Sequence, residues 1–214
     1  MADSRPVSIA APRRRGRQVL PTDQPPEGAT SPDAKPRLSF AGPVAKGKAP
    51  RHLADLDLAG RKQALKEAGL PAFRADQLSR HYFTHFTRNP ADMTDLPASQ
   101  RAALCDELLP DLLSQVRALK ADQGKTIKYL WELFDGVRVE SVLVRYKDRT
   151  TLCVSSEAGC GMACPFCATG QMGLTRNLST AAIIEQVRQA AAASRDGELA
   201  GGPARRSHIV FLGM

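Results

Sequence analysis

The sequence predicts an α/β protein in which a helical region precedes a β-hairpin and the first units of a parallel βα architecture. Three observations predict this fold class. Apolar residues recur at helical spacing over residues 53–118. The pattern then changes to a two-residue period over residues 126–155. A strand, a loop, a helix and a second strand follow one another over residues 150–212.

The helical region divides into three predicted helices. The first ends at the segment GLP (residues 69–71), whose glycine and proline stop a helix. The second covers residues 74–86, and the third follows Leu96-Pro97. Cys105 lies on the apolar side of the third helix, where we expect an ordinary core residue. We expect residues 51–120 to form a small helical domain.

The hairpin is predicted from two alternating segments, TIKYLWELF and VRVESVLVRY, which flank Asp135-Gly136. The segment TTLCVSS that follows is predicted to be a third strand. On the second strand, Glu140 alternates onto the same face as Val142 and Val144. We therefore expect apolar surroundings for Glu140, and such surroundings raise the pKa of a carboxyl group.

The last part of the sequence predicts the start of a parallel sheet. Ser179 or Thr180 can cap an amphipathic helix, and the apolar run over residues 209–212 is typical of a strand buried on both faces. One βα unit and a second strand cannot cover such a sheet. We therefore expect residues 121–214 to be an incomplete domain, and the chain to be the N-terminal portion of a larger protein.

Residues 1–50 differ in composition from the rest of the 214-residue chain. They contain nine of the fifteen prolines and one aromatic residue, Phe40, with nine Lys or Arg against four Asp or Glu. Such a composition buries too little apolar surface to fold, so we expect a disordered, basic, proline-rich extension. It can attract RNA or be only a solvated tail. The remaining residues carry just +3 of the net charge of +8, a weak nucleic-acid signal.

The cysteines and the hydropathy indicate the compartment. No apolar run approaches the roughly 20 residues of a membrane span, and the N-terminus lacks the apolar core of a secretory signal. The five cysteines are an odd number, and three of them are too clustered for a disulfide framework. We expect a cytoplasmic monomer without a membrane partner.

Three cysteines in the segment AGCGMACPFCATG, Cys160, Cys164 and Cys167, have the spacing C-x3-C-x2-C. Three thiolates can bind a [4Fe–4S] cluster and leave one iron open for an exchangeable molecule. The alternative is a structural zinc site in which Cys153 is the fourth thiolate. That alternative would make the chain a non-catalytic basic RNA-binding module.

Three longer segments carry a resemblance to a known family. RVESVLV, TLCVSSEAGCGMACPFCATGQMGLTRNLSTAAIIEQV and HIVFLGM closely resemble the RlmN/Cfr family of radical S-adenosylmethionine RNA methyltransferases, and GLPAFRADQL resembles its helical accessory domain. The resemblance covers roughly residues 53–214. It implies that residues 121–214 are the first part of a radical-SAM partial (βα) barrel. It also implies a dual-specificity enzyme that methylates C2 of adenosine in 23S rRNA and in certain tRNAs, with a Cfr-type enzyme acting at C8 of the same adenosine as the alternative.

The resemblance also implies cofactors and roles for individual residues. Cys160, Cys164 and Cys167 would hold the [4Fe–4S] cluster, whose open iron chelates S-adenosylmethionine, and Phe166 could pack near the adenine of that cosubstrate. Glu140 matches the proton acceptor of the family. Cys153 matches the cysteine that forms a disulfide with a second, methyl-carrying cysteine. That second cysteine would follow Cys167, and none does here. We therefore expect no RNA methylation by this chain alone. The resemblance also implies an external electron donor for the cluster.

Overall fold

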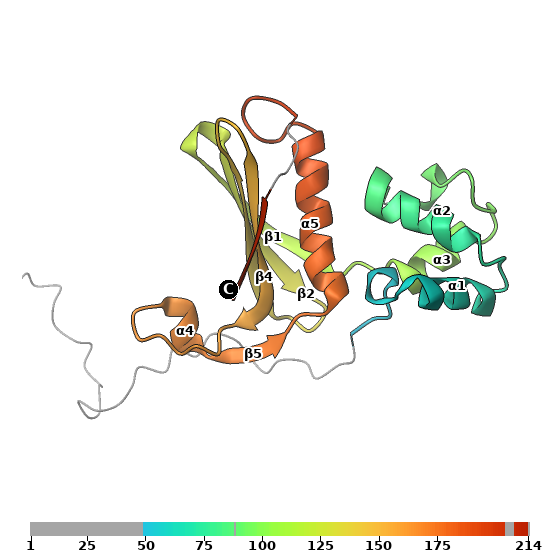
Figure 1. Cartoon of the computed structure of the whole chain (residues 1–214), viewed down its shortest axis with the longest axis horizontal. Helices are drawn as coiled ribbons and strands as arrows, with labels where there is room; N and C mark the ends of the chain where they lie inside the picture. Colours follow the sequence, from blue (N-terminus) through green and yellow to red (C-terminus); the bar gives the residue numbers. More distant parts are fainter. Residues whose placement is uncertain (1–48, 88, 204–207, 214) are drawn as a thin grey trace, which may run out of the picture. The chain divides into compact units, whose positions relative to one another are not determined.

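The computed structural model describes residues 49–87, 89–203 and 208–213, and the predicted extension of residues 1–50 lies almost wholly outside them. The described helices and strands belong to one compact unit. Figure 1 shows a group of short helices and a twisted sheet with a long helix against it. The domain boundaries expected at residues 50 and 120 stay a prediction.

The helical region begins and ends its helices near the predicted positions. Its elements are the turn η2 (Leu53–Asp55), α1 (Leu58–Glu67), α2 (Arg74–Arg80), the π-helical turn η3 (His81–His85), the turn η4 (Pro90–Asp92) and α3 (Arg101–Leu108). Gly69 takes a φ of 74°, the left-handed conformation that ends a helix. The expected helical pattern up to residue 118 is wrong after Leu108, because β1 (Leu113–Ala121) is a strand.

The sheet confirms the predicted hairpin and third strand. After the turn η5 (Asp122–Gly124) come β2 (Thr126–Leu133), β3 (Arg138–Arg145) and β4 (Thr150–Gly159). The short helix α4 (Ala168–Met172), β5 (Leu174–Asn177), α5 (Thr180–Arg195) and β6 (His208–Gly213) complete the described elements. The strand order is β1-β2-β3-β4-β5, with antiparallel neighbours. The strand β6 pairs with β4 in parallel, which confirms the predicted parallel unit.

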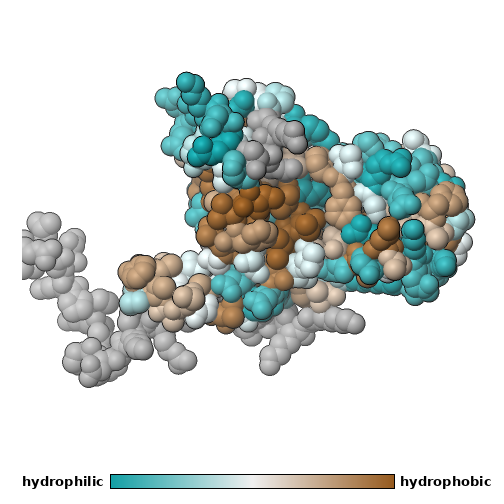
Figure 2. Space-filling view, in the orientation of Figure 1, coloured by the Kyte–Doolittle hydropathy of each residue, from teal (hydrophilic) through white to brown (hydrophobic). Residues whose placement is uncertain are grey.

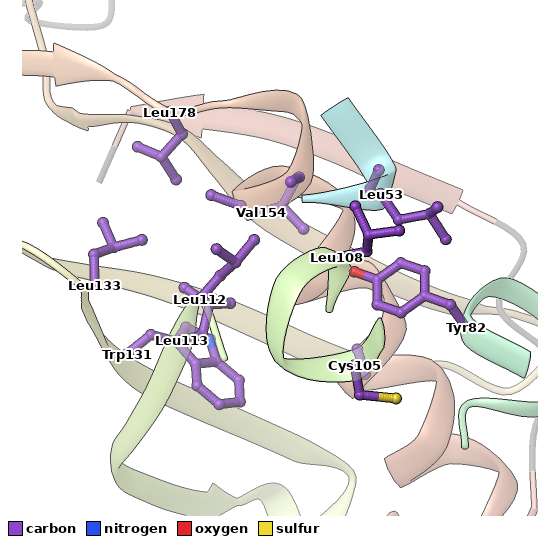
Figure 3. Close-up of a cluster of buried hydrophobic side chains, with 14 of the residues drawn as sticks. Leu53, Tyr82, Cys105, Leu108, Leu112, Leu113, Trp131, Leu133, Val154 and Leu178 are labelled. Atoms are coloured by element: carbon purple, nitrogen blue, oxygen red, sulfur yellow. The ribbon is translucent and has the colours of Figure 1, made fainter. Parts of the chain in front are cut away.

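The core lies between one face of the sheet and the helices. Trp131, Leu133 and Val154 from the strands join one cluster with Leu53 and Leu108 from the helical region. Figure 3 shows these side chains converging from both parts of the chain. Cys105 belongs to the same cluster, and its thiol lies 3.7 Å from the Met93 sulfur, so the expectation of an ordinary core cysteine is confirmed.

The strand β6 is not buried as predicted. The side chains of Ile209, Val210, Phe211 and Leu212 are between 40% and 60% exposed. They contribute to an apolar patch in the middle of the view in Figure 2, where β6 lies in Figure 1. The expectation of a strand buried on both faces is wrong in this structure, because among the described strands β6 has only β4 beside it.

Candidate functional site

The face of the sheet that turns away from the core carries both predicted catalytic residues. Leu130 lies opposite Glu140 and Lys128 opposite Val142, and Val142 in turn lies opposite Cys153. Residues directly opposite one another share a face, because side chains alternate along each strand. We call this the open face; its central residues are half-buried or exposed and comprise Lys128, Leu130, Glu140, Val142 and Cys153.

Glu140 forms an ion pair on the open face. Its Oε2 lies 2.8 Å from the Lys128 Nζ, and its side chain is 34% exposed. The apolar surroundings expected for Glu140 are therefore met only in part, since Leu130 and Val142 lie beside it but Lys128 adds a charge. The helices cover the opposite face, where Val139, Ser141 and Leu143 are buried. Alternation along one strand shows which residues share a face with Glu140, but the partner from the next strand depends on the register of the hairpin.

Cys153 lies in the interior of β4, where Val142 flanks it on β3 and Val210 on β6. Its thiol is free, as are those of the other four cysteines. The expectation of a disulfide is therefore not met in this chain. Six residues of extended strand separate Cys153 from Gly159, which corresponds to about 20 Å. A zinc ion binds thiolates at about 2.3 Å, so the proposed four-cysteine zinc site is wrong.

Close contacts between backbone atoms fix the two ends of the cysteine loop. The amide of Cys160 donates to the Gly173 carbonyl at 3.1 Å. Gly159 has a φ of 75°, and a Cβ there would lie 2.0 Å from the same carbonyl oxygen. A Cβ at Gly170 would lie 2.8 Å from the Cys164 amide nitrogen. Only glycine fits at these two positions, so the glycines fix the path of the chain around the cysteines.

The three thiols of the loop have the right chemistry for an iron–sulfur cluster. Cys160, Cys164 and Cys167 are half-buried and free, and all come from one loop. Within the described residues, no group of three or more His, Cys, Asp or Glu side chains converges closely enough to hold a metal ion. Cluster binding would therefore require the loop to bring its thiols together. Phe166 lies in this loop and is 89% exposed, and its role beside a cosubstrate stays a prediction.

The loop lies where two parallel strands end. It follows the carboxyl end of β4, and the carboxyl end of β6 is beside it, since a Cβ at Gly213 would lie 3.1 Å from the Cys160 Cβ. In α/β sheets, ligands bind outside the carboxyl ends of the parallel strands. The cysteine loop therefore lies at the carboxyl end of β4, the strand whose interior carries Cys153.

Two buried polar contacts support the strands of the site. The Gln186 side chain of α5 accepts a hydrogen bond from the Ser155 amide at 3.0 Å and donates one to the Ser155 carbonyl at 2.9 Å. The Ser155 hydroxyl donates to the Glu140 carbonyl at 2.7 Å. Gln186 was not identified from the sequence, because a glutamine within a helical apolar stripe gives no signal of the strand that it contacts.

A separate buried ion pair, between Asp135 and Arg176, joins the hairpin turn to β5. The Arg176 Nε lies 2.7 Å from the Asp135 Oδ2, and the Asp135 side chain is 3% exposed. Desolvation acts to raise the pKa of Asp135, but the hydrogen bond and the charge of Arg176 outweigh it and bring the pKa below its usual range. Arg176 therefore holds the hairpin turn beside β5.

Comparison with known proteins shows extensive similarity to one group. The chain is 61% identical over 177 residues to a protein of Rhodococcus erythropolis and 58% identical over 177 residues to one of Streptomyces coelicolor, both described as "Probable dual-specificity RNA methyltransferase RlmN". In each case the alignment covers 83% of this chain and 48% of the relative. No protein-family model matches the chain.

A solved structure has the same fold over most of the chain. It is the crystal structure of a radical SAM methyltransferase from Sphaerobacter thermophilus, with a TM-score of 0.69 and 42% sequence identity. The match covers 77% of this chain and 47% of that structure. The chain thus spans about half the length of the relatives that it matches.

Proposed function

Because this chain belongs to the RlmN family of radical SAM RNA methyltransferases, we propose that it forms the part of such an enzyme that binds the [4Fe–4S] cluster and S-adenosylmethionine. The whole enzyme would methylate C2 of an adenosine in 23S rRNA, and in tRNA as a second substrate. An external donor would supply its electrons. The observation that carries the proposal is the arrangement of the site, in which a three-cysteine loop borders an open sheet face with a carboxylate and a thiol.

Each predicted residue has a place in this proposal. Cys160, Cys164 and Cys167 would hold the cluster, which when bound supplies one electron to the sulfonium of the cosubstrate. Phe166, in the same loop, would pack against the cosubstrate adenine. The half-buried loop gives the thiols access to iron while the backbone around Gly159 and Gly170 keeps its path.

Glu140 and Cys153 would act on the RNA base. The Glu140 carboxylate would accept the proton that leaves C2 of adenine, and the ion pair with Lys128 would orient one of its oxygens. Cys153 would supply the thiol that closes a disulfide with a cysteine outside this sequence and so releases the methylated base. Both side chains need to reach the same base, and their position on one face of neighbouring strands supports this.

The proposal is tested by anaerobic reconstitution of the chain with iron and sulfide, followed by EPR of the reduced protein with and without S-adenosylmethionine. We expect a [4Fe–4S]⁺ signal that changes when the cosubstrate is added. Replacement of Cys164 by Ala should abolish the signal, whereas replacement of Cys105 by Ala, a core cysteine, should not. A wild-type protein that binds no iron, or a signal insensitive to the cosubstrate, would refute the proposed role.

A further inference from the structure

We propose that Lys128 is an RNA-binding residue of the open face, where its ammonium group binds a phosphate next to the adenosine that Glu140 faces. This inference rests on the proposed function, because it names a contact to the RNA substrate at the same site. Lys128 is neither a cysteine ligand nor one of the residues that the sequence pattern singled out as catalytic.

The register of the sheet places Lys128 beside both predicted catalytic residues. Lys128 lies opposite Val142, and Val142 lies opposite Cys153, so these three residues form one row across β2, β3 and β4. Glu140 lies two residues along β3 from this row. The Lys128 side chain therefore leans along the strand to reach the carboxylate at 2.8 Å.

The contacts of Lys128 leave it able to bind a further anion. An ammonium group has three donors, and the ion pair with Glu140 uses one of them. The side chain is 45% exposed, which gives the remaining donors access to the open face. Lysine binds phosphate as a point charge and needs no fixed bidentate geometry.

Arg117 is a second basic residue of the open face, because it lies opposite Leu130 and so in one row with Glu140. Two further basic side chains of the sheet are placed differently. Arg138 pairs with Glu132, the residue directly opposite, near the hairpin turn. Lys120 lies opposite Ile127, whose side chain is buried on the core face, and its ammonium donates to the Glu198 carbonyl at 3.1 Å. Lys128 is thus the cation that lies in one row with Cys153 and in contact with Glu140.

The ion pair makes the binding of RNA and the charge of Glu140 depend on each other. A phosphate at Lys128 would share the ammonium with the carboxylate, and the two anions repel. Removal of the Glu140 charge should therefore strengthen RNA binding through Lys128. A purely structural cross-strand pair predicts no such effect, and its loss would alter only stability.

The test measures RNA affinity and its salt dependence for the reconstituted 214-residue chain. The probe is a fluorescein-labelled RNA hairpin with one unpaired adenosine in its loop, titrated by fluorescence anisotropy at several KCl concentrations. Lys128→Met should weaken binding by roughly threefold to tenfold and lower the slope of log K against log[KCl] by about 0.7 to 0.9, the effect of one phosphate contact. Lys128→Arg should keep most of the affinity, and Glu140→Gln should increase it.

The matched control is Lys120→Met, which removes a lysine from the opposite side of the same sheet and should leave the slope unchanged. Circular dichroism and urea unfolding check that each variant folds. If wild-type protein binds the RNA and Lys128→Met binds it with the same slope, this inference is wrong and the proposed function stands. If wild-type protein forms its cluster but binds no RNA, the inference and the proposed RNA substrate both fail.

Discussion

Buried charges and glycines at single positions hold the backbone of the site. Asp135 is almost fully buried in the hairpin turn and is bonded to Arg176, while Gly159 and Gly170 allow backbone contacts that a Cβ would prevent. None of these residues is a predicted ligand or catalytic group. They determine where the cysteine loop and β5 can lie, so substitutions there test the site without altering its chemistry.

Replacement of Asp135 by Asn should reduce the free energy of unfolding by about 2 kcal/mol at pH 7, because it removes a charge-assisted bond and leaves Arg176 without its anion. The pKa of Asp135 is lowered in the folded state, so its stabilisation is complete above the ordinary pKa of aspartate and is lost as the pH falls through the folded pKa. Urea unfolding should therefore show a difference between the two proteins that shrinks from pH 7 toward pH 3.

The control is Asp148→Asn, which breaks an exposed pair with Arg149 and should change stability by less than about 0.5 kcal/mol. An Asp135→Asn variant as stable as wild type at pH 7 would show that the turn does not depend on this pair.

Replacement of Gly170 by Ala should prevent the cysteine loop from keeping its path, because the new methyl group would lie 2.8 Å from the Cys164 amide nitrogen. We expect iron and sulfide content after anaerobic reconstitution to fall to a small fraction of the wild-type value. Gly161→Ala is the matched control in the same loop, since its Cβ would meet only the Leu174 side chain at 3.7 Å. Full cluster loading of Gly170→Ala would contradict the proposed importance of this close approach.

At the scale of elements, the position of β4 decides the geometry of the site. This strand carries Cys153, ends at the cysteine loop and pairs with β3, β5 and β6. Helix α5 fixes it through the two hydrogen bonds of Gln186 to Ser155, at a point where the register between β4 and β6 shifts. A strand with such an irregularity needs partners for its backbone outside the ladder, and Gln186 provides them.

Replacement of Gln186 by Met keeps the side-chain volume but removes both hydrogen bonds to Ser155. Because this takes partners from a buried amide and a buried carbonyl, we expect the free energy of unfolding to fall by about 2 to 4 kcal/mol. Hydrogen exchange should increase most in β4 around Ser155. Gln115→Met, at an exposed position of β1, is the control and should change stability little. If the free energy of unfolding of Gln186→Met fell by less than about 0.5 kcal/mol, the range of a surface substitution, this role of Gln186 would be contradicted.

Two elements differ from the sequence-based expectation for the same physical reason. The strand β1 is exposed along almost its whole length, so its sequence has no two-residue alternation, and it forms because its backbone pairs with β2. The strand β6 has the composition of a buried strand, yet its burial depends on what packs against it. Sequence patterns report side-chain burial and give little information about backbone pairing at a sheet edge.

At the scale of the whole molecule, the helical region and the sheet share one core and one buried polar cluster. The Glu185 carboxylate of α5 accepts hydrogen bonds from the Tyr82 hydroxyl at 2.8 Å and from Arg188 at 2.6 and 2.7 Å. His52 packs edge-on against the Tyr82 ring at 5.0 Å. The Tyr82–Glu185 hydrogen bond joins residues 103 positions apart and holds the helical region against α5. Within the described residues, no helix is both long and apolar enough to span a membrane.

The buried His52 should make this packing sensitive to mild acid. Burial lowers the pKa of His52 below 6.5, even though Glu185 and Asp55 act in the opposite direction. The unfolded chain therefore binds a proton near pH 6.5 that the folded chain takes up only at lower pH, so stability falls as the pH drops below about 6.5, by at most about 1.4 kcal/mol per pH unit.

Replacement of His52 by Asn should remove this part of the pH dependence. Asparagine does not titrate, and its side chain can still accept the hydrogen bond from the Ala54 amide that His52 accepts now. Urea midpoints at pH 7 and pH 5 should differ less for His52→Asn than for wild type. An equal difference in both proteins would show that other groups cause the acid sensitivity.

The sequence by itself determined the local features of this protein. The spacing of Cys160, Cys164 and Cys167, the helices and their ends, and the Asp135-Gly136 hairpin all follow from residues close together in the chain, because caps, turns and ligand spacing are local. The α/β class follows as well, since periodicity shows which segments bury one face.

Only the tertiary structure decided what faces Glu140. The hairpin closes with Leu133 paired to Val137, so three residues form its loop and Glu140 lies opposite Leu130. A two-residue loop would shift the register by one position and place Glu140 opposite Trp131, on the core side. The two registers differ in burial, because the shifted one would bring Arg138 and Glu140 onto the face of Trp131 in place of Val139 and Leu143. The packing of the helices on the Trp131 face and the pair with Lys128 select one of them, because contacts between distant residues depend on the whole fold.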